Sequence, residues 1–274
     1  MDNVKDIPNI VNLNIILFKN IELNEKLDLF SILYKSNNII VQGYILQKKN
    51  LDKKVPVIIY CRGGNRKFGE VSPKSQIQNK EFLYMAENEK AIIFFPNYRG
   101  SSMSQGEDEF GGKDVHDIIA LYPIILQYNF CDSNRIALYG WSRGGMMAII
   151  VATMVDWVKT IILGGSMYSM TRAMQERPEM KKMWQDIFHL SKDDMRLRSP
   201  KYLMNKIPKN ISIMILHGSN DKSVSVSHAF SFGKKCQKYN ILYKLIIFPN
   251  GDHGLLQYRD DVMREVIQWF NIYL

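Results

Sequence analysis

Residues 135–145, Arg-Ile-Ala-Leu-Tyr-Gly-Trp-Ser-Arg-Gly-Gly, decide the fold of this chain. An apolar run ends at Tyr139, the pattern G-x-S-x-G follows over residues 140–144, and an apolar segment of helical character comes next. Because glycine lacks a Cβ, a sharp strand-to-helix turn can close here and leave the hydroxyl of Ser142 exposed. The helix N-terminus behind it offers free N–H groups suited to an oxyanion. The stretch therefore predicts a nucleophilic serine between a buried strand and a helix.

From residue 55 onward, short apolar runs alternate with longer segments of helical character. Uninterrupted apolar runs are typical of strands buried on both faces of a parallel sheet. Because right-handed crossovers join such strands, we expect an α/β fold with helices on both faces of a mostly parallel sheet. The expected strands are Val55–Cys61, Ala91–Pro96, Arg135–Tyr139, Val158–Leu163, Ile211–Leu216 and Tyr243–Phe248. The expected helices are Pro73–Asn88, Gly112–Tyr128, Arg143–Val155, Ser225–Tyr239 and Leu255–Tyr273.

Two further segments complete an expected single domain over residues 1–274. Leu27–Tyr34 and Asn38–Gln47 flank a turn-like Ser-Asn-Asn, so we expect an antiparallel hairpin within residues 1–50 at one edge of the sheet. Residues 166–210 have no strand pattern and are too many for a plain loop. We expect a helical cap insertion over the mouth of the sheet, with a helical extension packed on the side as the alternative.

Composition excludes several classes of protein. The chain has 274 residues, 46% of them hydrophobic and 23% charged, which rules out disorder and collagen-like repeats. The net charge is +9, but Lys and Arg are scattered, so a solvated basic surface is favoured over a nucleic-acid partner. The three cysteines fit a reducing compartment, and no pair of them has metal-ligand spacing. We expect no metal and no cofactor.

The N-terminus lacks the basic start and apolar run of a signal peptide. The longest apolar stretch falls short of the roughly 18–20 residues that a membrane span needs. We therefore expect a cytoplasmic protein with no membrane partner. The sequence leaves its oligomeric state open.

A serine nucleophile needs a base, and the base needs an orienting carboxylate. In an open parallel sheet, ligands bind at the carboxyl ends of the strands. His253 lies in such a position, between the last strand and the last helix, and Asp221 lies in the loop after the preceding strand. Asp252 is the rival acid, but it is adjacent to His253 and its side chain should diverge from the imidazole. We expect Ser142, Asp221 and His253 to be nucleophile, acid and base.

The other four histidines are less suited to act as the base. They are His116, His189, His217 and His228. His116 precedes the serine, against the expected order of serine, acid and histidine. His189 lies in the irregular insertion. His217 has no strand-end carboxylate between it and the serine, and His228 falls early in a predicted helix.

A tetrahedral intermediate needs hydrogen-bond donors aimed at its oxyanion. One expected donor is the backbone N–H of Arg143, the residue after the nucleophile. The second is expected from the loop Arg62-Gly63-Gly64-Asn65, which follows the strand Val55–Cys61. Its two glycines would let the backbone approach a substrate closely. An ordinary glycine-rich turn is the alternative for this loop.

Taken together, these stretches resemble the α/β-hydrolase superfamily and, more narrowly, the catalytic domain of the prolyl oligopeptidase family of serine peptidases. The stretches that carry the resemblance are residues 59–65, 97–101, 111–117, 140–145, 217–221 and 251–254. It covers roughly residues 30–274. The resemblance implies an α/β-hydrolase fold with an eight-stranded type of sheet. It also implies a serine hydrolase that acts on short peptides through an acyl-enzyme.

The sequence departs from that family in two respects. Family peptidases commonly carry a β-propeller, which we do not expect here, so a carboxylesterase or thioesterase acting on small acyl esters is the alternative. Arg62 stands where the family often has Tyr or His, and Arg143 stands where Tyr is frequent. An arginine near the mouth would favour substrates with a carboxylate or phosphate. We expect substrate contacts from Arg62, Asn65, Tyr98, Trp141 and Arg143. A catalytically inactive binding protein of the same fold is a further alternative, against which the presence of all three triad residues argues.

Overall fold

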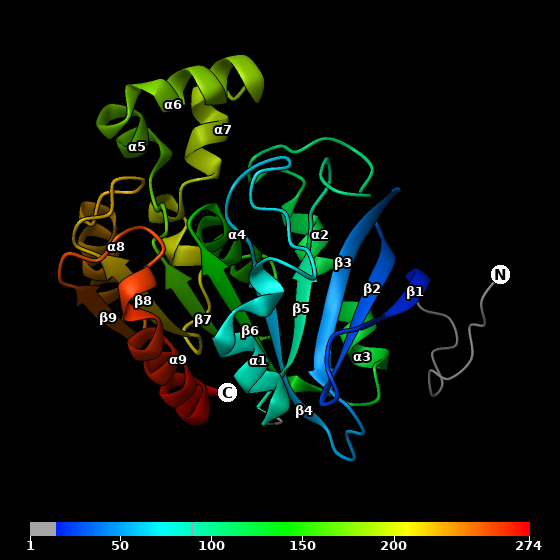
Figure 1. The fold of residues 1–274 in the computed structure, drawn as a ribbon. Coiled ribbons are helices and arrows are strands. Elements are labelled where there is room, and N and C mark those ends of the chain that lie inside the picture. Colours follow the sequence, from blue (N-terminus) through cyan, green and yellow to red (C-terminus); the bar gives the residue numbers. More distant parts are fainter. Residues whose placement is uncertain (1–14, 89) are drawn as a thin grey trace.

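The strands form one sheet in the computed structural model, which describes residues 15–88 and 90–274 (Figure 1). Within these residues the sheet has nine strands in the order β1-β2-β3-β5-β4-β6-β7-β8-β9. Their bounds are β1 Ile15–Glu22, β2 Leu27–Ser36, β3 Ile39–Lys48, β4 Val55–Cys61, β5 Ile92–Pro96, β6 Cys131–Trp141, β7 Val158–Gly164, β8 Ser212–Gly218 and β9 Tyr243–Phe248. The pairs from β1 to β5 along that order are antiparallel, and those from β5 to β9 are parallel.

This arrangement confirms the predicted α/β class and its mostly parallel sheet. The prediction of eight strands is wrong by one, because β1 adds an antiparallel strand outside the expected hairpin. The hairpin itself has Ser36 paired with Ile39, so Asn37 and Asn38 form a two-residue turn. Asn37 has a φ of 53°, a conformation that asparagine tolerates better than most residues.

Helices cover both faces of the sheet (Figure 1). Their bounds are α1 Lys80–Glu87, α2 Val115–Ile119, α3 Tyr122–Gln127, α4 Arg143–Ala152, α8 Ser227–Lys238 and α9 Arg259–Tyr273. The apolar side chains of α1 and α9 pack in one core, and those of α2, α3, α4 and α8 pack in a second core across the sheet. Every residue of α4 is buried, which explains why its sequence is almost wholly apolar. No helix of the described residues is long and apolar enough to cross a membrane.

Two predicted helices begin or divide differently in the structure. The segment predicted as Pro73–Asn88 becomes helical with the short 3₁₀ turn Gln76–Gln78 and then α1. The segment Gly112–Tyr128 forms two short helices, α2 and α3, with Pro123 in the first turn of the second. Proline lacks an N–H and is tolerated only in a first turn, so a continuous helix cannot pass through it without losing a hydrogen bond.

Residues 166–210 are helical, as the sequence predicts, and contain no strand. Their elements are α5 Met170–Glu176, α6 Pro178–Lys182, the π turn Met183–Ile187, α7 Lys192–Leu197, and the 3₁₀ turns Pro200–Tyr202 and Met204–Lys206. Figure 1 shows α5, α6 and α7 grouped at one end of the molecule. Asn65 Nδ2 lies 3.6 Å from Met183 Sδ, and the rings of Phe110 and Phe188 lie 5.2 Å apart. The insertion therefore contacts the loops that follow β4 and β5.

Candidate active site

Ser142 lies on a tight turn between β6 and α4. Its φ of 55° and ψ of −122° fall outside the regions that most residues adopt. A Cβ at Gly140 would lie 2.5 Å from the carbonyl oxygen of Gly144, and a Cβ at Gly144 would collide with the carbonyl of Cys61. Both glycines are thus required by close packing of the turn. The backbone N–H of Ser142 donates to the carbonyl of Gly164 at 2.8 Å, which ties the turn to the end of β7.

Gly165, the residue after the end of β7, lies directly under the imidazole of His253. A Cβ built on Gly165 would lie 3.1 Å from Nδ1 and 3.2 Å from Cε1 of His253, so the ring lies directly over this glycine. Ser142 and His253 therefore contact two adjacent residues, Gly164 and Gly165. The end of β7 brings together two residues that lie far apart in the chain.

Asp221 holds the imidazole from the other side. Its Oδ2 lies 2.7 Å from Nδ1 of His253, and its Oδ1 accepts the backbone N–H groups of Ser223 and Val224 at 2.8 Å each. Burial raises the pKa of Asp221, but the hydrogen bonds from His217 and His253 and the charge of His253 outweigh it. The pKa therefore lies well below that of an ordinary aspartate. Since Nδ1 is bound to Asp221, Nε2 of His253 is the ring nitrogen left to face a substrate or a serine.

The rival acid points elsewhere. Oδ1 of Asp252 accepts the backbone N–H of Leu256 at 3.1 Å, within the turn that leads to α9. This agrees with the expectation that its side chain diverges from the imidazole of its neighbour.

His217, which was not expected to act as the base, contacts the carboxylate of Asp221. Its Nε2 lies 2.8 Å from the carbonyl oxygen of Val224 and 3.2 Å from Oδ2 of Asp221, and its side chain is fully buried. Both neighbours are acceptors, so Nε2 carries the proton and donates. The motif His217-Gly-Ser-Asn-Asp221 contained the signal, because a histidine four residues before a strand-end acid can reach it across the loop.

The loop after β4 lies against the serine turn. A Cβ on Gly63 would lie 3.1 Å from Cβ of Ser142 and 3.1 Å from the carbonyl oxygen of Trp141. Arg143 begins α4, so its backbone N–H has no partner within the helix. The backbone of Gly63 and the N–H of Arg143 thus lie beside Ser142.

The expectation that the Arg62 side chain contacts substrate is contradicted by its burial. Arg62 is fully buried and donates to the carbonyl oxygens of Asn97 and Phe68 and to Oγ of Ser101, at 2.8–3.2 Å. Its guanidinium lies 5.0 Å from the ring centre of Tyr98. Tyr98 is itself fully buried, so its expected substrate contact is contradicted as well. These two side chains hold the loops after β4 and β5 together.

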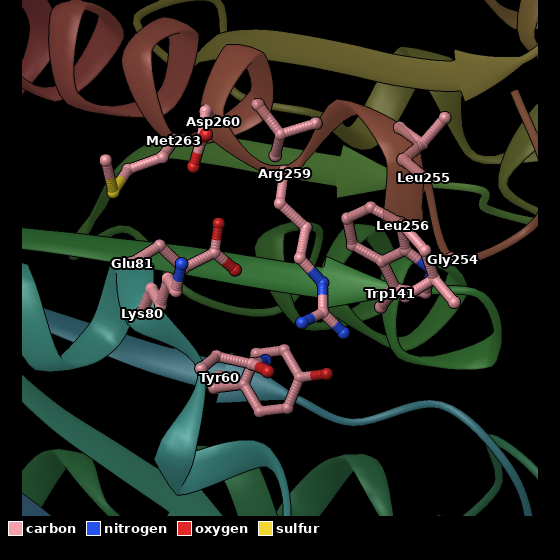
Figure 2. Close-up of a pocket in the computed structure, with 12 residues that line it drawn as sticks. Tyr60, Lys80, Glu81, Trp141, Gly254, Leu255, Leu256, Arg259, Asp260 and Met263 are labelled. Atoms are coloured by element: carbon pink, nitrogen blue, oxygen red, sulfur yellow. The ribbon is translucent and has the colours of Figure 1, made fainter.

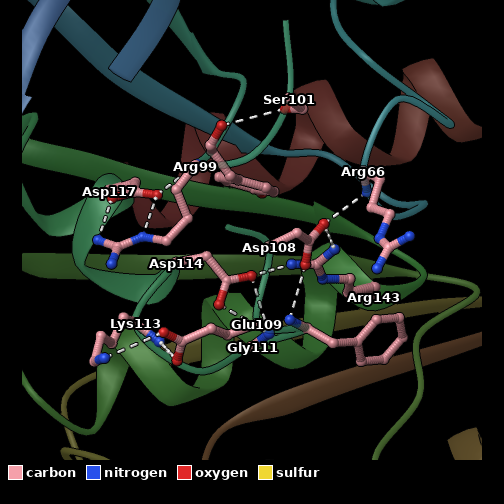
Figure 3. Close-up of polar contacts among 12 residues, drawn as sticks. Arg66, Arg99, Ser101, Asp108, Glu109, Gly111, Lys113, Asp114, Asp117 and Arg143 are labelled. Atoms are coloured by element: carbon pink, nitrogen blue, oxygen red, sulfur yellow. Dashed lines mark hydrogen bonds and ion pairs between the residues drawn. The ribbon is translucent and has the colours of Figure 1, made fainter. Parts of the chain in front are cut away.

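Arg143 is also turned inward rather than toward a mouth (Figure 3). Its side chain is 2% exposed and forms ion pairs with Asp108, at 2.7 Å, and with Asp114. Its Nη1 also donates to the carbonyl of Gly64 at 3.1 Å, and the guanidinium packs on the ring of Phe110. Burial lowers the pKa of Arg143, but the charges of Asp114 and Asp108 outweigh it and raise the pKa above the ordinary arginine value. A cation neutralised in this way is not available to a substrate, which contradicts the expected side-chain contact.

The remaining expected contacts are partly exposed. Asn65 is half-buried beside Met183 of the insertion. Trp141 is half-buried, its Nε1 donates to the carbonyl oxygen of His253 at 2.9 Å, and its indole packs on Gly164. Trp141 therefore links the residue before the serine to the histidine loop.

Comparisons with known proteins agree with the fold and the family that the sequence resembles. Residues 77–274 match the model of the prolyl oligopeptidase family. The chain is 24% identical, over 88% of its length, to the uncharacterized peptidase YtmA of Bacillus subtilis and covers 92% of that protein. It is 23% identical to the probable dipeptidyl-aminopeptidase B of Aspergillus terreus but spans only 27% of that longer protein.

Solved structures share the fold. The acylaminoacyl peptidase of Pyrococcus horikoshii superposes with a TM-score of 0.77 at 18% identity, over 91% of this chain and 42% of that one. The acetyl xylan esterase of Paenibacillus sp. R4 superposes with a TM-score of 0.74 at 13% identity, over 96% of this chain and 90% of that one. At these identities the likeness establishes the α/β-hydrolase fold alone. Since the family model matches most of the chain, this protein belongs to the prolyl oligopeptidase family.

Proposed function

We propose that this chain is a serine hydrolase that cleaves short peptides through an acyl-enzyme. The observation that carries the proposal is the 2.7 Å contact between Nδ1 of His253 and Oδ2 of Asp221. The imidazole lies over Gly165, and the preceding residue, Gly164, accepts the backbone N–H of Ser142. A base held in one orientation by a carboxylate, next to a serine on a strained turn, has the arrangement that activates a hydroxyl nucleophile. Family membership and the peptidases among its relatives favour peptide bonds over esters.

In the proposed reaction, Oγ of Ser142 attacks the carbonyl carbon of the substrate while Nε2 of His253 takes the hydroxyl proton. The N–H of Arg143 and the backbone of Gly63 or Gly64 stabilise the oxyanion that forms. When the intermediate collapses, the bond to the leaving amine breaks and His253 gives its proton to that amine. Water, deprotonated by His253, then attacks the acyl-enzyme; the ester bond breaks, His253 returns the proton to Oγ of Ser142, and the acid is released. Asp221 stays ionised throughout and stabilises the imidazolium.

The insertion of residues 166–210 contributes a cap in this proposal. Its Met183 contacts Asn65, its Phe188 packs against Phe110, and the guanidinium of Arg66 lies 5.4 Å from the ring centre of Phe188. These contacts support a cap that lies over the loops proposed to carry the oxyanion donors. Substrate would enter beside it, in the part of the site bounded by those loops.

The first test is covalent labelling. A fluorophosphonate should add one mass equivalent to the wild-type protein and none to Ser142→Ala, while Ser72→Ala, a serine in the loop before α1, should label like wild type. Equal labelling of Ser142→Ala, or an unlabelled wild type, would contradict the proposal.

A second test separates substrate classes. Because p-nitrophenyl esters are intrinsically more reactive than anilides, an enzyme without a preference for peptide bonds would cleave the esters faster. The kcat/KM for aminoacyl and dipeptidyl anilides should exceed the value that this difference in reactivity predicts. Turnover of the esters with no cleavage of any anilide would instead support an esterase.

A further inference from the structure

A pocket of about 320 Å³ lies on the face of the sheet that α1 and α9 cover (Figure 2). Its volume is at the lower end of the range of small-molecule sites, enough for one or two amino-acid residues. Figure 2 shows the residues that form its walls, among them Tyr60, Glu81, Trp141, Leu255, Leu256 and Arg259. Most of this surface is aromatic or aliphatic, with charged groups at a few positions.

The pocket adjoins the proposed active site through two covalent neighbours. Trp141 precedes Ser142, and Gly254 follows His253, and both line the pocket. The hydrogen bond from Nε1 of Trp141 to the carbonyl of His253 joins these two walls. The insertion and α4 pack in the core on the opposite face of the sheet. The pocket therefore lies on the face of the sheet opposite the insertion and α4, next to the loop that carries His253.

A cation lies in the middle of this pocket. Figure 2 shows the guanidinium of Arg259 extended from the start of α9 to the space between Tyr60 and Trp141. Among the described residues, Arg259 has no direct ion-pair partner, whereas the buried Arg143 pairs with Asp108 and Asp114. A guanidinium beside aromatic walls is well suited to bind a carboxylate through two parallel hydrogen bonds.

Glu81 is the one acidic group on the α1 side of the pocket, and Asp260 the one on the α9 side. The carboxylate of Glu81 accepts a hydrogen bond from the hydroxyl of Tyr139 at 3.2 Å. Burial raises the pKa of Glu81 to about 7, against the lowering effects of Tyr139 and Arg259. Near neutral pH, Glu81 is therefore only partly ionised, and its repulsion of a bound carboxylate is correspondingly reduced.

We propose that this pocket binds the leaving-group side of the substrate, and that Arg259 binds the carboxylate at the end of that group. The inference rests on the proposed function, in which His253 passes its proton to the leaving amine on this side of the site. It assigns a substrate class: peptides that end in a free carboxylate one or two residues beyond the cleaved bond.

Competition against ester hydrolysis tests the pocket without knowledge of the acyl specificity. Leucyl-leucine and leucyl-leucinamide are compared as inhibitors of p-nitrophenyl butyrate hydrolysis. The free acid should inhibit wild type at about 5- to 20-fold lower concentration than the amide. In Arg259→Gln this ratio should fall to about one, and in Arg264→Gln, an exposed arginine of the same helix outside the pocket, it should remain as in wild type.

Glu81→Gln provides a variant with the opposite expectation. Removal of the competing carboxylate should leave the preference for the free acid intact or increase it. A wild-type ratio near one, or an unchanged ratio in Arg259→Gln, would overturn the inference while ester turnover and labelling of Ser142 still supported the proposed function. A wild type that neither turns over the ester nor labels would overturn both.

Discussion

Oδ2 of Asp108 accepts hydrogen bonds from Nη1 of Arg143 at 2.7 Å and from the backbone N–H of Arg66 at 2.6 Å. One carboxylate oxygen thus joins the residue after the proposed nucleophile to the loop after β4. Oδ1 of the same residue accepts the N–H of Phe110 at 2.8 Å, within the loop after β5 to which both residues belong. The burial of this group raises the pKa of Asp108, but Arg143 outweighs that effect, so the pKa lies below the ordinary value and the group stays ionised. Asp108 is therefore a positioning residue for both proposed sources of oxyanion donors.

Asp108→Asn is expected to lower kcat about 10-fold or more, with a smaller change in KM. The amide keeps the size of the side chain but is neutral, so it forms no ion pair with the buried guanidinium and holds the loop and the serine turn together less firmly. Stability should fall by about 2–4 kcal/mol, as for other broken buried ion pairs, and urea unfolding measures it. Asp193→Asn, an exposed acid in α7, should change neither quantity. Equal kcat in wild type and Asp108→Asn would contradict a positioning role.

Asp221→Asn is expected to reduce kcat by about 10⁴-fold, because an amide no longer stabilises the imidazolium and can favour the wrong tautomer of His253. Asp252→Asn is the matched control, since its side chain bonds the N–H of Leu256 instead of the imidazole. It should cost less than about 10-fold. Steady-state rates on a p-nitrophenyl ester are sufficient, and a larger loss in Asp252→Asn would reverse the assignment of the acid.

His217→Leu is expected to lower kcat about 10-fold with little change in KM. The variant removes the donor that faces Oδ2 of Asp221 and the carbonyl of Val224, so the carboxylate loses one of the contacts that fix it. His217→Gln can replace the donated hydrogen bond and should recover part of the rate. If Leu and Gln gave the same rate at equal stability, packing rather than hydrogen bonding would explain the effect of His217.

Much of the proposed site was accessible from the sequence because its signals are local. The glycines around Ser142, and the short loops that carry Asp221 and His253, each follow an apolar run that reads as a strand. The rule that parallel strands end at one edge of the sheet then places the three loops together. Their contacts with Gly164 and Gly165 in the structure are consistent with that placement.

The directions of the arginine side chains were not accessible in the same way. Arg62 and Arg143 lie at the ends of strands. The local sequence at such a position does not distinguish an exposed arginine side chain from a buried one. Arg143 turns inward because Asp108 and Asp114, from a loop about 30 residues earlier, lie beneath it. No periodicity or spacing in the sequence reports such a pairing. The edge strand β1 was not predicted either. Among the described residues it pairs with β2 alone, and apolar and polar residues do not alternate along it.

Gly144→Ala is expected to destabilise the protein severely. The new Cβ would collide with the backbone carbonyl of Cys61, which belongs to the central strand β4 and cannot move aside. We expect a loss of more than about 4 kcal/mol, or a failure to recover folded protein. Gly233→Ala, in the interior of α8, would meet a ring edge of Tyr243 at 3.2 Å and Cδ2 of Leu245 at 3.4 Å, both of them side-chain atoms, and should change stability by less than about 1 kcal/mol. Circular dichroism and urea unfolding compare the two.

Glu81→Gln should change how stability depends on pH. Burial raises the pKa of Glu81 to about 7 in the folded protein, whereas an unfolded glutamate has a pKa of about 4.3. Between these values the unfolded chain has lost the proton while the folded protein retains it, so this group lowers stability as pH rises through the window. The glutamine variant does not titrate and lacks this penalty.

The stability of Glu81→Gln relative to wild type should therefore increase by about 1–2 kcal/mol between pH 5 and pH 8. This is less than the full shift would give, because the side chain is only half-buried. Urea unfolding of both proteins at the two pH values measures the change, and other titrating groups cancel in the difference. Glu107→Gln, at an exposed position, should give the same difference at both pH values. A relative stability of Glu81→Gln that fell toward pH 8 would mean that Glu81 is ionised and paired, most directly with Arg259, and the pocket would then lack a free cation.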